Sequence, residues 1–269
     1  MKKFVLLLLL IIIAGITIFY GRIEYNKKIQ QSVFQAQGEM DRYKEELEER
    51  QQQEELERQN YILTLAKNMD QQLSDMFVQA IEKGEVIHVV TMGSAALSAE
   101  DDELSWPRLV ESAVNGRYGT NIIKIDVLSY GRENTFEVVR KGRHLHAAEM
   151  NPDIFILEPF IWNDNGYARI VDTLYHVDVI IDAVQSENED VIVLIQPPNP
   201  IYGAGHYINQ VNALKDHAKE NNLRYIDHWQ NWPESTDEAL HEFITEESTP
   251  NQEGHEIWSD YIIDFFAAK

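Results

Sequence analysis

The chain has 269 residues, enough for one domain of ordinary size with additional segments, and carries a formal net charge of -22 from 45 acidic and 23 basic residues. So acidic a chain repels phosphate backbones and anionic lipid surfaces, which argues against nucleic-acid binding and against adhesion to a charged membrane surface. The absence of cysteine excludes disulfides, thiolate metal sites, a cysteine nucleophile and a lipidated cysteine anchor.

Residues 1–22 are predicted to anchor the chain in a membrane. Lys2 and Lys3 precede the apolar run 4–20, FVLLLLLIIIAGITIFY, which as a helix spans about 26 Å, close to a ~30 Å hydrocarbon core. A cleaved signal peptide shares this charged start and apolar centre, but no A-x-A-like site follows the run. Basic residues flank both ends and barely discriminate orientation. We expect a single-pass signal anchor with an extracytoplasmic domain.

Residues 23–84 are predicted to form a helical stalk, because proline is absent and Glu, Gln, Lys and Arg dominate. Apolar residues recur there at alternating spacings of four and three, in two runs separated by the almost wholly polar stretch 48–61. The runs are Ile29, Val33, Ala36, Met40, Tyr43 and Leu47, then Ile62, Ala66, Met69, Leu73, Met76 and Ala80. This pattern favours a parallel coiled coil and a homodimer. The alternative is a single solvated helix whose last turns pack on the domain.

Residues 85–269 are predicted to form a three-layer α/β domain. Short apolar runs, expected to be strands, alternate with segments of helical periodicity. The strands are expected at 87–91, 122–127, 154–157, 191–195 and 225–226, and the helices at 105–114, 135–148, 167–185, 207–221 and 251–267. Continuous apolar strands between amphipathic helices indicate a five-stranded parallel sheet that is covered on both faces.

Four polar segments stand where ligands bind in such sheets, beyond the carboxyl ends of the strands and at the start of the last helix. They are Gly93-Ser94-Ala95, Ser129–Asn134, Glu158–Gly166 and Glu246–His255. Their order over residues 86–268 resembles the SGNH/GDSL hydrolases, a family of esterases and acyl hydrolases with a flavodoxin-like sheet. The resemblance implies that Gly131 and Asn163 are oxyanion-hole residues. It also implies that Ala95 stands at the nucleophile position, Glu246 at the catalytic acid and Thr249 at the catalytic histidine. Pro250, Asn251, Gly254 and His255 match the end of the family's last motif.

The chemistry that this resemblance implies is incomplete. A methyl group cannot attack an ester, and a threonine hydroxyl is no base near neutral pH. We therefore expect a catalytically impaired protein that binds an acylated or acetylated envelope glycan, or that scaffolds partner enzymes. The alternatives are an active esterase that uses Ser94 as nucleophile and an imidazole such as His206 as base, and a purely structural membrane tether.

Several of these residues also have simpler interpretations. Asn163 and Asp164 are good helix caps, although Ser94, Asp164 and His206 are candidates to line the pocket. His255 is expected to pack or to form hydrogen bonds. His144 and His146, two apart on an expected helix, point to different faces, and no phosphate-loop or dinucleotide glycine pattern is present. We expect neither a metal nor a cofactor.

Overall fold

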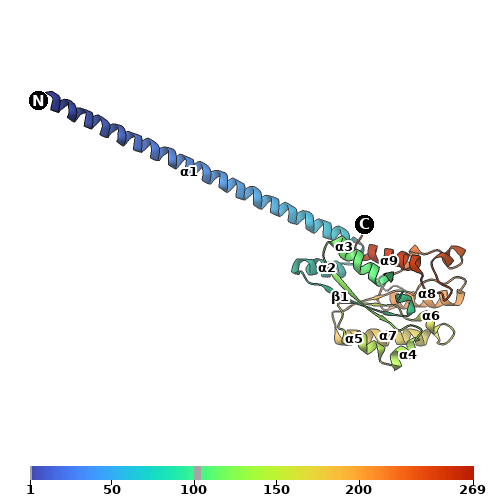
Figure 1. Cartoon of the computed structure of the whole chain (residues 1–269). Coiled ribbons are helices and arrows are strands. Elements are labelled where there is room, and N and C mark those ends of the chain that lie inside the picture. The colour runs from blue at the N-terminus through green and yellow to red at the C-terminus, as the bar shows by residue number, and fades with distance from the viewer. Residues whose placement is uncertain (1, 100–103) are drawn as a thin grey trace. The chain divides into compact units, whose positions relative to one another are not determined.

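The computed structural model describes residues 2–99 and 104–269, and the chain divides into two compact units. The first unit ends at Asn60 and the second is Tyr61–Lys269. Helix α1, Lys2–Leu65, is one uninterrupted helix and provides the described residues of the first unit (Figure 1). Its side chains are exposed through Tyr61. By length and composition its apolar start could cross a membrane, and a signal sequence near the N-terminus has the same properties.

The segment 61–84 differs from the stalk that was predicted there. Helix α1 stops at Leu65, a 3-10 turn η1 follows at Ala66–Asn68, and α2 spans Gln71–Lys83 after an Asp70 cap that accepts the Leu73 N–H at 3.0 Å. Leu73 and Phe77 are completely buried in the core of the domain. The second apolar run of the stalk is therefore part of the domain, as in the alternative interpretation, and its residues are spread over α1, η1 and α2 instead of one helix face.

The sheet confirms the predicted architecture. Strands β1 (Ile87–Gly93), β2 (Ile123–Ser129), β3 (Ile154–Leu157), β4 (Ile192–Ile195) and β5 (Arg224–Tyr225) are all parallel, in the order β2-β1-β3-β4-β5. Along β3, Ile154 and Ile156 face one core while Phe155 and Leu157 face the other, as the alternation of side chains in a strand requires. Both faces of the sheet are thus covered.

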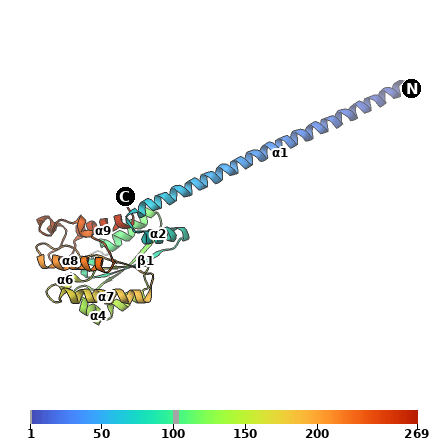
Figure 2. The same ribbon diagram turned by 180° about the vertical axis from the view of Figure 1, so that it is seen from behind.

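Helices form the two outer layers. One core joins the sheet to α2, α3 (Trp106–Tyr118) and α9 (Gln252–Phe266). The other joins it to α4 (Thr135–Arg140), α5 (Arg143–Glu149), α6 (Ile161–Asp164), α7 (Ile170–Glu187) and α8 (Gly205–Glu220). The views from front and back show α9 and α2 on one side of the sheet and α7 and α4 on the other (Figures 1 and 2).

The helix predicted at 135–148 is two helices in the structure. Gly142 lies between α4 and α5 with φ of 69°, in the left-handed region that favours glycine. Short 3-10 turns complete the connections: η2 (Ala95–Leu97), η4 (His228–Asn231) and η5 (Glu238–Glu242). The strand order reverses at β1 and β3, so the segments that follow these two strands diverge and leave room for a site.

Candidate functional site

An open pocket of about 710 Å³ lies beyond the carboxyl ends of the strands. The loops after β1, β2, β3 and β4 and the segment before α9 all contribute to its wall. It brings together four of the residues singled out from the sequence, namely Ala95, Asn163, Glu246 and Thr249, and Ser94 lines it as well. The four segments predicted to converge therefore meet around one cavity.

The turn after β1 is packed too tightly for any residue but glycine at its start. A Cβ atom on Gly93 would lie 2.5 Å from the Glu158 carboxylate and 3.0 Å from the Glu158 carbonyl oxygen. Ser94 then caps η2, its hydroxyl accepting the Ala96 N–H at 3.2 Å, and is only 5 % exposed. Ala95, half-buried, presents a methyl group to the pocket.

Of the two oxyanion donors implied by the family resemblance, the Gly131 N–H and the Asn163 amide, the Asn163 amide is occupied by the chain itself. The Gly131 carbonyl oxygen accepts the Ala95 N–H at 3.0 Å and one Asn163 side-chain N–H at 3.0 Å, and the Glu133 carbonyl accepts the other at 2.8 Å. Gly131 makes this approach with φ of 58°. An amide nitrogen has only two hydrogens, so Asn163 has none left for a ligand. The Asn163 side chain is therefore engaged in this structure, whereas no hydrogen bond described within residues 2–99 and 104–269 uses the Gly131 N–H.

The segment before α9 positions Thr249 within a small turn of its own. Its hydroxyl lies 2.8 Å from the Thr245 hydroxyl, its N–H donates to the same hydroxyl at 3.3 Å, and its carbonyl accepts the Thr245 N–H. Ser248 has φ of 63°, and its carbonyl accepts an N–H of Asn199 from the loop after β4. Thr249 is thus a structural hydroxyl on the pocket wall, while Glu246 beside it is exposed.

An ion pair joins two sides of the pocket. The Arg132 guanidinium, from the loop after β2, donates to the Glu247 carboxylate at 2.5 Å, and both side chains are well exposed. Because the pair is exposed, its contribution to stability is small. Glu137 and Glu246 also line the cavity, which therefore carries an excess of negative charge. Such a wall disfavours anionic ligands.

Asp164 and His206 do not line this pocket, contrary to expectation. Asp164 is completely buried and accepts the Thr135 N–H at 2.9 Å and the Thr135 and Thr173 hydroxyls at 2.7 and 2.5 Å, so that it ties α6 to α4 and α7. His206 is exposed in the first turn of α8 and lines a separate hollow. Neither side chain therefore lines the pocket. Three hydrogen-bond donors hold the Asp164 carboxylate in the interior, and His206 lies on the wall of the separate hollow.

The motif residues that do match the family pattern before α9 have structural roles. Asn251 caps α9 by accepting the Gly254 N–H at 2.9 Å. A Cβ on Gly254 would lie 2.1 Å from the Phe243 carbonyl, so only glycine fits there. His255 accepts the Trp106 N–H at Nδ1, and its Nε2 donates to the Ser98 carbonyl. Burial lowers the pKa of His255 to about 4, so it is a neutral, hydrogen-bonding histidine, as expected.

A buried carboxyl beneath the turn was not anticipated. Glu158 is completely buried, and one of its oxygens accepts the Ser94 N–H at 2.6 Å. Among the described residues the other oxygen has no hydrogen-bond partner and no cation pairs with the group. Burial raises its pKa to about 7, against the opposing effect of the Ser94 and Phe160 hydrogen bonds. A charged residue directly after an apolar strand was the sequence signal that could have revealed it.

The pocket rim supplies aromatic and amide groups that sequence reasoning also missed. Trp162 packs edge-on against Tyr207, with ring centroids 5.5 Å apart, and Tyr167 is 87 % exposed at the rim. Within residues 2–99 and 104–269, the Trp162 indole N–H, the Tyr167 hydroxyl and the Asn165 amide form no hydrogen bond, so they remain available to a ligand. Helical and strand periodicity cannot identify such groups, because they lie on loops and short turns.

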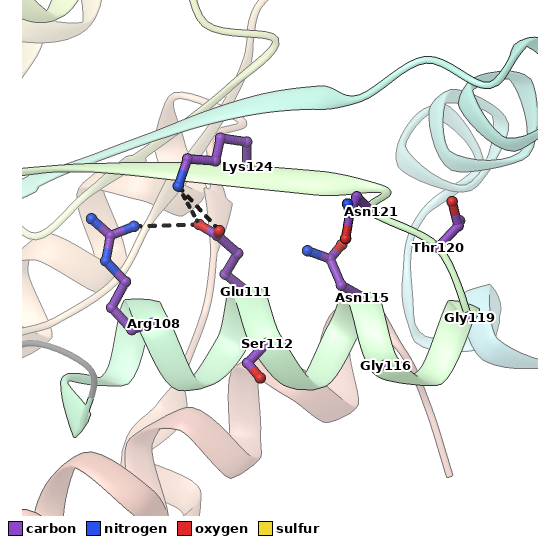
Figure 3. Close-up of a pocket in the computed structure, with 9 residues that line it drawn as sticks. All are labelled: Arg108, Glu111, Ser112, Asn115, Gly116, Gly119, Thr120, Asn121 and Lys124. Atoms are coloured by element: carbon purple, nitrogen blue, oxygen red, sulfur yellow. Dashed lines mark hydrogen bonds and ion pairs between the residues drawn. The ribbon is translucent and has the colours of Figure 1, made fainter.

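A second hollow, of about 680 Å³, lies between α3 and the outer edge of β2 (Figure 3). Its polar side chains mainly serve the edge strand. The Asn115 amide bonds both the N–H and the carbonyl of Ile123 at 3.0 Å, and the Glu111 carboxylate accepts the Ile125 N–H at 2.7 Å. These bonds satisfy backbone groups that would otherwise invite another strand. The polar side chains of this hollow therefore protect the edge of the sheet from pairing with another strand.

No protein-family model matches the sequence, and no curated protein matches it. Solved structures do match the fold. A protein described as lipolytic, of the G-D-S-L family from Desulfitobacterium hafniense, is 16% identical with a TM-score of 0.54, covering 66% of this chain and 99% of its own. The acetyl xylan esterase AlAXEase is 17% identical (TM-score 0.53, 65% and 98% covered). An acetyl esterase mutant with an acetate ion is 13% identical (TM-score 0.55, 66% and 95% covered). The domain therefore has the fold of the SGNH/GDSL hydrolases.

Proposed function

We propose that this protein is a membrane-anchored, SGNH/GDSL-fold domain that binds a cell-envelope glycan on the extracytoplasmic side and does not hydrolyse it. One observation carries the proposal. The pocket remains open, at about 710 Å³, although Ala95 and Thr249 occupy the positions that the family resemblance assigns to the nucleophile and the histidine. An open pocket supports a ligand-binding role, whereas a purely structural tether needs no cavity.

The absence of turnover follows from three independent deficits. Ester hydrolysis by this route needs a hydroxyl nucleophile, an imidazole base and free donors for the oxyanion. Here a methyl group and a hydroxyl replace the first two. The Gly131 carbonyl already accepts the N–H groups of Ala95 and Asn163. Losing one member of a triad already costs several powers of ten in rate, and this site lacks both the nucleophile and the base while its Asn163 donor is engaged.

A relocated serine mechanism finds little support. The Ser94 hydroxyl caps η2 by accepting the Ala96 N–H. Within the described part of the chain, no hydrogen bond joins an imidazole to that hydroxyl. His255, one turn into the last helix, has both ring nitrogens engaged with backbone groups. A base must lie within hydrogen-bond reach of the proton it removes, so we do not propose an active esterase.

The chemistry of the rim favours a neutral sugar chain as ligand. Trp162 and Tyr167 offer flat apolar faces, while Asn165 and Glu246 offer a donor and an acceptor for hydroxyl groups. The acidic wall disfavours phosphate or carboxylate ligands. One structural neighbour is described as an acetyl xylan esterase and another as an acetyl esterase, which supports an acetylated glycan as the ligand class.

The acyl group of such a glycan contributes little to affinity in this proposal. Of the two donors that the resemblance implies for its carbonyl oxygen, the Asn163 amide already binds the Gly131 and Glu133 carbonyls. Recognition then rests on the sugar ring and its hydroxyls. Acetylated and deacetylated forms of one oligosaccharide are expected to bind within about threefold of each other.

Binding and turnover can be measured together on the full chain in detergent micelles. Acetylated xylo-oligosaccharide and its deacetylated form are titrated by calorimetry, and released acetate is assayed in the same samples. We expect saturable binding without acetate release. Tyr167→Ala should weaken binding about tenfold, whereas Tyr175→Ala, at another exposed tyrosine, on α7 and outside the pocket, should not.

Acetate release well above a Tyr167→Ala control would overturn the absence of turnover. No binding of either oligosaccharide would overturn the glycan proposal and favour a scaffolding role instead. Anchoring and orientation are tested separately, by membrane fractionation and by protease treatment of intact cells. The domain is expected in the membrane fraction and accessible to external protease.

A further inference from the structure

We propose that two copies of this chain pair in parallel along the segment Ile29–Leu47 of α1. The inference rests on the membrane anchoring proposed above, and on the first compact unit alone. Six of the seven apolar side chains of this segment, all but Phe34, form one row, and those of Ile29, Val33, Met40, Tyr43 and Leu47 are 44–64 % exposed. Exposed apolar rows of this regularity in a long helix are typical of an unfilled helix-helix seam.

The second apolar run provides an internal comparison. It has the same alternating spacing, but Ile62, Ala66 and Leu73 are buried against the domain. That run has found its partner within the chain. The first run lies in a unit whose side chains from residues 2 to 60 are all exposed, so no described residue of that unit packs over it.

The spacing fixes a heptad register over the segment. Val33, Met40 and Leu47 take the a positions, and Ile29, Ala36 and Tyr43 take the d positions. Gly38 then falls at f, on the side of the helix opposite the seam, where a residue without a side chain costs the interface nothing. The polar residues that follow Leu47 place Arg50 and Glu54 at the next d and a positions, so the seam ends there.

Charges beside the seam identify the occupant as a second copy of the same chain. In this register Glu39 is a g residue and Lys44 is the e residue five positions later. In a parallel dimer each g side chain lies near the e side chain five residues later in the other helix. Glu39 of each copy therefore meets Lys44 of the other, giving two attractive pairs. Anchoring through the N-terminal end imposes the same parallel orientation.

A coiled coil of three heptads associates weakly in free solution, but anchoring both helices in one membrane favours the dimer. Confining two helices to one plane in one orientation makes their encounter nearly intramolecular and raises the effective concentration. A short seam is then sufficient. The pairing leaves each globular domain with its own pocket, so it adds avidity for a polymeric glycan without altering the site.

The chain has no cysteine, so single cysteines can report on the seam in the full-length protein in native membranes. Ala36→Cys places a thiol at d, and Gly38→Cys places a matched thiol half a turn away at f. A disulfide requires Cα atoms within about 7 Å. Under mild oxidation we expect at least fivefold more disulfide-linked dimer from Ala36→Cys than from Gly38→Cys.

The flanking charges supply a second measurement in the Ala36→Cys background. Lys44→Glu sets like charges opposite each other and should lower the linked fraction at least twofold. Adding Glu39→Lys to Lys44→Glu exchanges the two charges and should restore the linked fraction. Equal crosslinking at positions 36 and 38, or none at either, would overturn the proposal, as would failure of the exchanged pair to restore the loss. Membrane fractionation of the same samples and the oligosaccharide titration report separately on anchoring and on glycan binding.

Discussion

The buried carboxyl of Glu158 makes the stability of the domain depend on pH in a direction that can be calculated. Its pKa is raised from the ordinary 4.5 to about 7 by complete burial, and the Ser94 N–H at 2.6 Å compensates only in part. The folded state therefore holds a proton that the unfolded state has lost between these two values. Where the folded state binds more protons, the free energy of unfolding falls as pH rises.

The magnitude follows from the two pKa values. A difference of about 2.5 corresponds to about 3 kcal/mol, at ~1.4 kcal/mol per pKa unit. This contribution to stability is fully present below pH 4.5 and is lost as the pH rises to about 7. Glu158→Gln keeps the size and the acceptor for Ser94 but cannot ionise. The variant is expected to gain about 3 kcal/mol relative to the parent between pH 4.5 and pH 8.

The assay is urea unfolding of the detergent-solubilised full chain, followed by tryptophan fluorescence at several pH values. Only the difference between Glu158→Gln and the parent is interpreted, because buried histidines titrate over an overlapping range in the opposite direction. Burial lowers the pKa of His228 to about 3 and of His255 to about 4, so they destabilise the fold as pH falls. Glu149→Gln, at the exposed end of α5, is the matched control. A difference that stays constant from pH 4.5 to pH 8 would refute the reasoning.

Three further changes test other parts of the structure. Ala95→Ser combined with Thr249→His is expected to show no esterase activity on p-nitrophenyl acetate, because the Asn163 amide still binds the Gly131 and Glu133 carbonyls; turnover in this double variant would contradict a requirement for that donor. Gly254→Ala should lower the free energy of unfolding by about 1–3 kcal/mol, since its Cβ would overlap a backbone carbonyl, and an unchanged urea midpoint would count against that contact. Leu73→Ala should cost about 2–5 kcal/mol in the same assay, because the side chain is completely buried in the domain core; a residue of a solvated stalk would cost almost nothing.

The residues that match the family pattern have structural roles, whereas those that depart from it lie on the pocket wall. Asn251 and Gly254 match, and each is held by a contact that the fold needs. Asn163 also matches, yet both its side-chain hydrogens bind backbone carbonyls and hold the loop after β2. Ala95 and Thr249 depart, and both lie on the pocket wall. The resemblance therefore located the cavity correctly, while the matching residues proved to be structural.

The sequence by itself determined the elements that depend on local order. Strand and helix periodicity predicted the five parallel strands and the main helices, and uninterrupted apolar character predicted the N-terminal helix that could cross a membrane. Those signals come from residues a few positions apart. The motif spacing also placed Ala95 and Thr249 at one site, because parallel strands end at a common edge.

Only the tertiary structure decided which partner each group finds. The runs 29–47 and 62–80 have the same spacing, yet one is exposed and the other packs into the core. Asp164 and His206 looked like pocket residues, but distant threonines hold the first and a separate hollow takes the second. The Gly131 carbonyl accepts N–H groups of Ala95 and Asn163, residues far from it in the chain. Burial and hydrogen-bond partners are set by contacts between distant segments, which local spacing does not encode.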